Sequence, residues 1–121
     1  MPNFIIKNMN RHLIIPAVYL IPKYTKNQYC LTRRFNTGYM DGFYSLPAGH
    51  LDGGENLVEA MIREAKEEVG IVIKPNDLNL VHVSNNLFSK PERIDFFFIC
   101  EKWTGDVVII PNPSSTLAFN Y

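Results

Sequence analysis

A single run from Gly49 to Ile71, GHLDGGENLVEAMIREAKEEVGI, constrains this 121-residue chain more than any other feature. Two glycines, four glutamates and one arginine stand at fixed spacings within it. On ordinary composition, such a set would arise at a given starting point by chance about one time in 10^8. The run therefore predicts a functional segment. Its fixed residues are Gly49, Glu55, Arg63, Glu64, Glu67, Glu68 and Gly70.

The second half of this run has the composition of an α-helix. Residues Leu57 to Val69 contain no glycine or proline and are rich in strong helix formers. Asn56, with Glu59 three residues later, makes an N-terminal capping pair. Gly70 stands where a left-handed C-terminal cap is expected. The sequence thus predicts a helix from Leu57 to Val69 with both ends capped.

Two faces of the predicted helix differ in chemistry. At about 100° per residue, Glu64, Glu67 and Glu68 share a face roughly 130° from an apolar stripe. A solvated acidic face is one interpretation, but like charges at positions i and i+4 repel each other. A divalent cation would offset this repulsion, and oxygen ligands alone favour Mg²⁺ or Mn²⁺ over zinc. The stripe consists of Val58, Ile62, Ala65 and Val69.

The segment from Gly49 to Glu55 precedes the helix and contains three glycines. Glycine allows the backbone to approach other groups closely. Carbonyl groups of this loop can then join a metal shell, and its amides can meet phosphate near the helix N-terminus. We expect the loop and the glutamate face to form one site.

At these residues the chain resembles the Nudix hydrolase family. The run from Gly49 to Ile71 matches the Nudix box, G-x5-E-x7-R-E-U-x-E-E-x-G-U, with Ala65 at the first apolar (U) position. The resemblance implies an α/β fold, an α/β/α sandwich with a mixed sheet, in which the box forms loop, helix and loop. It also implies hydrolysis of a nucleoside diphosphate that is linked to another group. The resemblance is strongest over residues 35–103.

The resemblance also implies which residues bind the metal. The expected ligands are the carboxylates of Glu64, Glu67 and Glu68, joined by the carbonyl group of Gly49. The expected ion is Mg²⁺, with Mn²⁺ as an alternative.

The resemblance implies further roles in catalysis. Glu55 and Arg63 are expected to form an ion pair that holds the loop against the helix. A carboxylate must take a proton from the attacking water. Within the box this general base is Glu64 or Glu67. The candidates outside the box are Glu92 and Asp95.

The substrate is less strongly indicated. Arg33 and Arg34 precede a loop and are candidates for phosphate contacts, although either can equally be a surface charge. Tyr39 is a candidate for stacking on a base, with a place in the core as the alternative.

Subclass markers downstream of the box are missing. The window from Asn86 to Ser89 holds neither the proline typical of ADP-ribose pyrophosphatases nor the tyrosine typical of dinucleoside polyphosphate hydrolases. No signature of coenzyme A or NADH diphosphatases is visible either. By elimination, the chain resembles a MutT-type enzyme that converts a nucleoside triphosphate into a monophosphate and pyrophosphate. The alternatives are an ADP-ribose or nucleotide-sugar pyrophosphatase, and a nucleotide-binding module with little turnover.

Composition limits the class of protein further. The chain is 46% hydrophobic, and we expect one domain over residues 1–121. Lysine plus arginine equals aspartate plus glutamate, 12 each, so no net charge favours polymeric nucleic acid or a membrane surface. Cys30 and Cys100 are expected to be buried thiols rather than a disulfide. A cytoplasmic location is expected.

The remaining chain predicts strands and an unusual C-terminus. Asp95 to Cys100 is apolar on both faces and should be central in the sheet. Pro16 suggests a bulge or a sheet edge, and Leu117-Ala118-Phe119 is a candidate last strand. No glutamate follows Glu101, and we expect the usual C-terminal helix to be lacking. One sheet face would then be uncovered, and we favour a homodimer that covers it, with a naturally short chain or an altered tail as the alternatives. The predicted strands are 13–21, 29–33, 43–46, 78–88 and 93–102.

Overall fold

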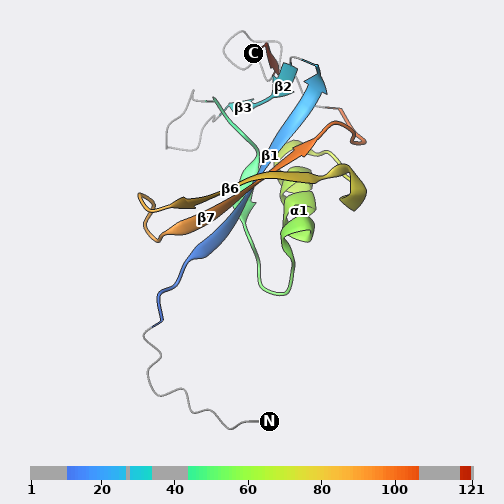
Figure 1. The fold of residues 1–121 in the computed structure, drawn as a ribbon. Helices are drawn as coiled ribbons and strands as arrows, with labels where there is room; N and C mark the ends of the chain where they lie inside the picture. The colour runs from blue at the N-terminus through green and yellow to red at the C-terminus, as the bar shows by residue number, and fades with distance from the viewer. Residues whose placement is uncertain (1–10, 27, 34–43, 107–117, 121) are drawn as a thin grey trace.

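The computed structural model describes residues 11–26, 28–33, 44–106 and 118–120. It contains a mixed β-sheet with one α-helix packed on it (Figure 1). The elements are β1 (Ile15–Thr25), β2 (Gln28–Cys30), β3 (Thr32–Arg33), β4 (Tyr44–Ser45), β5 (Ala48–His50), α1 (Leu57–Val69), the 3₁₀-helix η1 (Pro75–Asp77), β6 (Asn79–Asn86), β7 (Arg93–Cys100) and β8 (Ala118–Asn120).

The main sheet has the strand order β6-β7-β1-β2-β8, and β5 also pairs with β1. Strand β1 runs parallel to β7 and antiparallel to β5 and β2. Strand β7 lies between β6 and β1, so the prediction of a central strand from Asp95 to Cys100 is confirmed. Strands β3 and β4 pair separately with each other.

Helix α1 has the predicted bounds because its local end signals are satisfied. The Asn56 side chain accepts a hydrogen bond from the Glu59 amide at 2.8 Å, and the Glu59 carboxylate accepts one from the Asn56 amide at 3.4 Å. Gly70 adopts the left-handed conformation with a φ of 73°, and its amide donates to the Lys66 carbonyl at 3.1 Å. Such caps contribute about 1 kcal/mol each.

The buried face of α1 differs from the predicted stripe. Ala60, Met61 and Ala65 are fully buried, whereas three members of the stripe, Val58, Ile62 and Val69, are only partly buried. Two small alanines let the helix approach the sheet closely. Glu64 follows Met61 by three positions and Ala60 by four, so it shares their face. Glu64 is thus nearer to the sheet than the predicted stripe implied, and its side chain is only 15% exposed.

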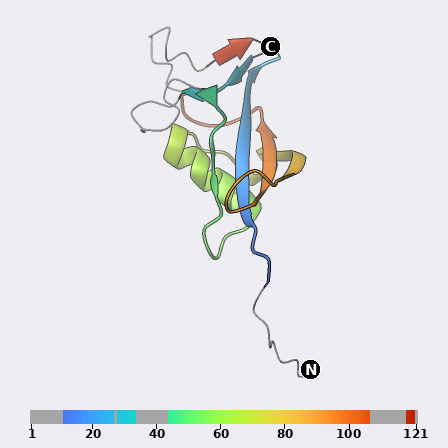
Figure 2. The same cartoon turned by 90° about the vertical axis from the view of Figure 1, so that its left-hand side faces the viewer.

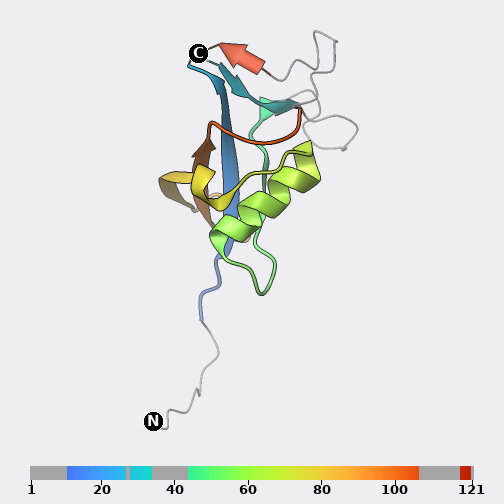
Figure 3. The same cartoon turned by 90° about the vertical axis from the view of Figure 1, so that its right-hand side faces the viewer.

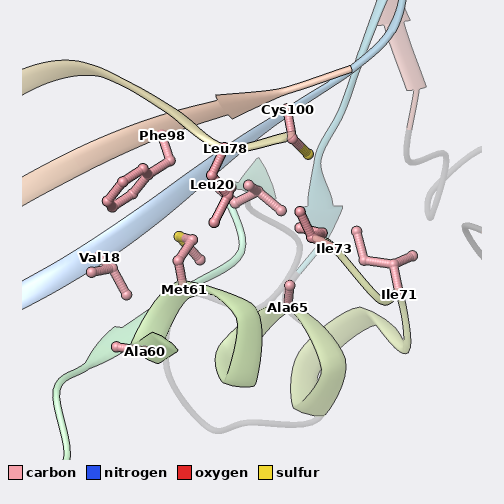
Figure 4. Close-up of a cluster of buried hydrophobic side chains, with 10 residues drawn as sticks. All are labelled: Val18, Leu20, Ala60, Met61, Ala65, Ile71, Ile73, Leu78, Phe98 and Cys100. Atoms are coloured by element: carbon pink, nitrogen blue, oxygen red, sulfur yellow. The ribbon is translucent and has the colours of Figure 1, made fainter. Parts of the chain in front are cut away.

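The core lies between α1 and one face of the sheet (Figure 4). Val18 and Leu20 of β1 and Phe98 of β7 point toward Met61 of the helix. Burying each such side chain contributes roughly 1.5–3 kcal/mol. The other fully or nearly fully buried members are Ala60, Ala65, Ile71, Ile73, Leu78 and Cys100.

Several strand predictions are adjusted by the sheet register. Pro16 pairs beside Ile94 near the start of the central strand β1, so the predicted bulge or edge at Pro16 is wrong. The irregular register of β1 falls instead between Lys23 and Thr25. The predicted last strand is present as β8, which pairs antiparallel with β2.

The two faces of the sheet are covered differently. In the side views, α1 lies on one side of the sheet and runs obliquely to the long strand β1 (Figures 2 and 3). The opposite face carries Tyr19 and Phe97, whose rings stack with centroids 4.7 Å apart. Within the described ranges, α1 is the only α-helix, and none of their helices has the length and apolarity needed to cross a membrane.

Candidate active site

The loop before α1 is held against the helix by strand β5. Gly49 pairs with Val18 of β1, whose side chain points to the helical side of the sheet. A Cβ atom placed on Gly49 would collide with the carboxylate of Glu64. The glycine is therefore required by the close approach of a helix side chain rather than by a turn.

Arg63 ties this loop to the helix. Its Nη2 donates to Oε1 of Glu55 at 2.7 Å, and its Nε donates to Oε2 at 3.0 Å. Nη2 also donates to the backbone carbonyl of His50 at 3.0 Å. The Arg63 side chain is 25% exposed, so this paired arrangement lies partly out of water and is stronger than a surface ion pair.

The same guanidinium group reaches two glutamates of the helix. Nη1 of Arg63 donates to Oε1 of Glu64 at 2.8 Å and to Oε2 of Glu67 at 3.1 Å. The Glu64 side chain is 15% exposed and the Glu67 side chain 60%. One cation thus neutralises carboxylates from both the loop and the helix. We call Arg63, Glu55, Glu64 and Glu67 the Arg63 network.

Hydrogen bonding stabilises the charged forms of Glu55 and Arg63. The hydrogen bond from Arg63, helped by one from the Asp52 amide at 2.7 Å, lowers the pKa of Glu55. The hydrogen bond to Glu55 in turn raises the pKa of Arg63, with a further contribution from Glu64. Asp52 also lies 3.4 Å from Nε of Arg63, a contact that the sequence did not predict.

Glu68 contacts the start of β5 instead of the Arg63 network. Its Oε2 accepts a hydrogen bond from the Ala48 amide at 2.7 Å. The Glu68 carboxylate therefore contacts the residue before Gly49, and the Glu64 carboxylate lies against Gly49 itself. Three expected metal ligands, Gly49, Glu64 and Glu68, are brought together where β5 meets α1.

The donor atoms at this junction fit a hard divalent cation. They are carboxylate and carbonyl oxygens, which Mg²⁺ prefers, without sulfur or imidazole. In the described part of the chain, no three His, Cys, Asp or Glu side chains form a ready metal cluster. Arg63 lies between Glu64 and Glu67, and Glu67 is the more exposed of these two glutamates.

The two general-base candidates outside the box are occupied elsewhere. Oε2 of Glu92 lies 2.6 Å from Nε2 of His12. Asp95 is 5% exposed and accepts a hydrogen bond from Nε of Arg93 at 3.1 Å, which raises the pKa of Arg93. Both carboxylates therefore make contacts at the start of strand β7.

The predicted substrate residues lie mostly beyond the described part. Arg33 belongs to β3 and pairs with Tyr44. Arg34 and Tyr39 lie outside the described residues.

The structure also contains a cavity of about 320 Å³ that the sequence did not predict, because its lining residues come from separate strands and loops. The cavity is lined by Ile21, Tyr29, Leu31, Leu46 and Ile99.

Comparison with known proteins identifies the class. The NUDIX domain model matches residues 14–118, and the chain therefore belongs to the Nudix family. Members of this family are hydrolases that act on phosphoanhydride bonds and generally use divalent metals such as Mg²⁺. The predicted family and its α/β fold are thus confirmed.

Individual relatives give more detail. The chain is 34% identical over 76 residues to the NAD-capped RNA hydrolase NudC of Escherichia coli and of Shigella boydii. This match covers 63% of the chain and 28% of each relative, so the chain spans about a quarter of their length.

Solved structures share the fold. A MutT/nudix family protein from Enterococcus faecalis aligns with a TM-score of 0.71 and 17% identity, over 95% of this chain and 46% of that one. The MutT protein from Methanosarcina mazei aligns with a TM-score of 0.66 and 24% identity, over 88% and 75%.

Proposed function

We propose that the chain hydrolyses the diphosphate of a nucleoside diphosphate linked to another group, with Mg²⁺ or Mn²⁺ as cofactor. The observation that supports this most is the Arg63 network. It joins the loop to the helix and holds Glu64 against Gly49. A merely solvated acidic helix face would need no glycine in contact with a carboxylate.

In this proposal the metal is held by Glu64, Glu67, Glu68 and the carbonyl group of Gly49. When bound, it neutralises the anionic phosphate oxygens and polarises the phosphorus. Arg63 orients the carboxylates and keeps the loop in place.

The proton of the attacking water goes to a carboxylate of the network, Glu64 or Glu67. Glu64 is the more deeply held, at 15% exposure, whereas Glu67 is 60% exposed and open to water. Glu55 is a positioning residue in this scheme, because it acts on the site through Arg63. Arg33, Arg34 and Tyr39 are proposed to contact the substrate.

A nucleoside triphosphate is the first candidate substrate, with a nucleoside monophosphate and pyrophosphate as products. It follows from the missing markers of other subclasses downstream of the box. ADP-ribose and nucleotide sugars are the alternatives from the same reasoning.

The identity to NudC favours a second candidate, a dinucleotide of the NAD type. Here the cleaved bond would join the two phosphates of the dinucleotide. The balanced charge of the chain, 12 basic against 12 acidic residues, favours the free dinucleotide over an RNA polymer that carries it.

One experiment tests the activity and its substrate together. The protein is incubated with Mg²⁺ and nucleoside triphosphates, NAD, NADH, ADP-ribose, nucleotide sugars or dinucleoside polyphosphates, and the products are separated by chromatography. Turnover of one class supports the proposal and identifies the substrate. Nucleotide binding without turnover of any would instead indicate a binding module.

The Glu68→Gln variant tests the metal assignment. We expect it to lose Mg²⁺-dependent turnover while its thermal unfolding changes little, because the amide still accepts from Ala48. The matched control is Glu59→Gln on the same helix, which keeps an acceptor for the capping box and should remain active. Full activity of Glu68→Gln would remove Glu68 from the metal site.

We also propose that residues 1–121 form a single domain and that the protein is located in the cytoplasm. The second is supported by the two cysteines, which are both free and buried. Burial raises the pKa of Cys100 to about 12, so its thiol is protonated and unreactive at neutral pH.

A further inference from the structure

Strand β6 forms an exposed edge of the main sheet. Within the described residues it pairs with β7 alone, and its other side ends the strand order. Five consecutive residues, 79–83, are exposed. Leu80, Val81 and Val83 are each about half exposed, although they are large apolar side chains in a strand. Such an edge offers unpaired backbone groups beside apolar surface.

The turn after β6 extends this apolar surface. Oδ1 of Asn86 accepts hydrogen bonds from the amides of Phe88 and Ser89 at 3.0 and 3.1 Å, which fixes the turn. Phe88 is 97% exposed and Leu87 is 65% exposed. The edge and the turn together form one patch, the β6 patch, consisting of Leu80, Val81, Val83, Leu87 and Phe88.

The charge pattern of this segment indicates its partner. From Leu78 to Phe88 the sequence LNLVHVSNNLF contains no lysine, arginine, aspartate or glutamate. Exposed edge strands usually carry charged residues or proline that prevent pairing with another strand. A bulge at Val81 disturbs only the first half of β6, which leaves residues 82–86 regular. This segment can pair with an identical segment without placing like charges opposite each other.

We propose that β6 is a homodimer interface in which two copies pair antiparallel, edge to edge, across a twofold axis. An antiparallel strand pair is self-complementary, as a twofold interface requires. The uncharged strand meets its own copy, and the two sheets become continuous. The β6 patches flank the paired strands and exclude water from them.

This surface differs from the one expected from the sequence, which was the sheet face left without a C-terminal helix. The side chains on that face, such as Tyr19, Phe97 and Ile99, are partly buried. Among the described residues, the largely exposed apolar side chains gather instead at β6 and its turn.

The first test measures the molar mass of the wild-type protein by light scattering and sedimentation over a range of concentrations. We expect a monomer–dimer equilibrium. Val83→Lys should raise the dimer dissociation constant by about tenfold or more, because paired strands disfavour like charges near each other. Leu13→Lys adds the same charge at an exposed apolar residue outside β6 and should dimerise like the wild type. Val83→Thr, which retains the shape, should also dimerise.

A second measurement needs no variant and therefore does not depend on how Val83→Lys folds. Backbone hydrogen exchange of residues 82–86 should slow as the wild-type concentration rises. A wild-type monomer at every concentration, a dimer that Val83→Lys leaves intact, or exchange in β6 that ignores concentration would each overturn the proposal. Hydrolytic activity is a separate readout, so a failure here leaves the proposed function untouched.

Discussion

Replacing Gly49 with alanine should change the geometry of the site while the protein still folds. Gly49 lies in the regular strand β5, where an alanine backbone is acceptable. The added Cβ would occupy the space of the Glu64 carboxylate. That carboxylate is the far end of a flexible side chain, so it can swing away while the backbone stays in place. The variant should therefore fold and yet carry a displaced Glu64.

The cost can be estimated from these contacts. Moving the carboxylate breaks the 2.8 Å hydrogen bond from Nη1 of Arg63 to Glu64. A charge-assisted hydrogen bond contributes about 1.5–3 kcal/mol, partly recovered here by water and by the lower entropy of alanine in the unfolded chain. We expect a net loss of stability of about 1 kcal/mol. A catalytic group misplaced by roughly 1 Å costs about 10²-fold in rate, so kcat/KM should fall by about that factor.

The assay compares Gly49→Ala with Gly53→Ala, using urea unfolding and Mg²⁺-dependent turnover of the identified substrate. Gly53 lies in the loop between β5 and α1, and a Cβ on it would meet nothing within 4 Å. Gly53→Ala should keep both stability and activity. If Gly49→Ala were as active as the control, the position of Glu64 against Gly49 would be irrelevant to catalysis. If it failed to fold, the carboxylate would not be free to move.

Three other substitutions test the Arg63 network and the core. Arg63→Lys keeps the charge but cannot bridge Glu55, Glu64 and Glu67 at once, so turnover should fall about 10- to 100-fold with about 1–3 kcal/mol lost in urea unfolding; unchanged turnover would contradict the bridging role. The pKa of Glu55 is lowered in the folded state, so its stabilisation is present above the unfolded pKa near 4.5 and disappears as the pH falls through the folded pKa. Glu55→Gln should flatten that acid dependence, and an unaltered slope would show that another group causes it. Met61→Ala empties a fully buried site and should cost about 2–5 kcal/mol at an unchanged denaturant m-value, whereas a loss below about 1 kcal/mol would mean that the core collapses around it.

The helix could be predicted to the residue because its end signals are local. Asn56, Glu59 and Gly70 act within a few positions of the backbone groups that they cap. The buried face of the helix was predicted less well, because periodicity ranks side chains by apolarity alone. Distance to the sheet depends on size as well, and the small Ala60 and Ala65 allow the close approach that buries Met61.

The pairing of β5 with β1 could not be read from the sequence. Ala48 to His50 is a short segment without the β-branched residues that indicate a strand. It becomes a strand because it pairs with residues Ala17 to Tyr19 on the side of β1 opposite β7, a contact between distant parts of the chain. The same non-local pairing places Gly49 beside Glu64. The motif therefore predicted a glycine at this position, but the steric reason for the glycine depends on the pairing of β5 with β1.

Arg63 brings a positive charge of the protein's own to the glutamate face of α1. A divalent cation would offset the repulsion between the closely spaced glutamates, but the guanidinium group of Arg63 already lies within hydrogen-bonding distance of Glu64 and Glu67. Repulsion therefore cannot by itself distinguish a metal site from an ion-pair network. Two contacts favour the proposed metal site: Glu68 accepts a hydrogen bond from the Ala48 amide of β5, and Gly49 leaves room for Glu64 beside the backbone. In the proposed site both contacts place carboxylate oxygens at the β5–α1 junction, where they would hold the metal together with the carbonyl group of Gly49.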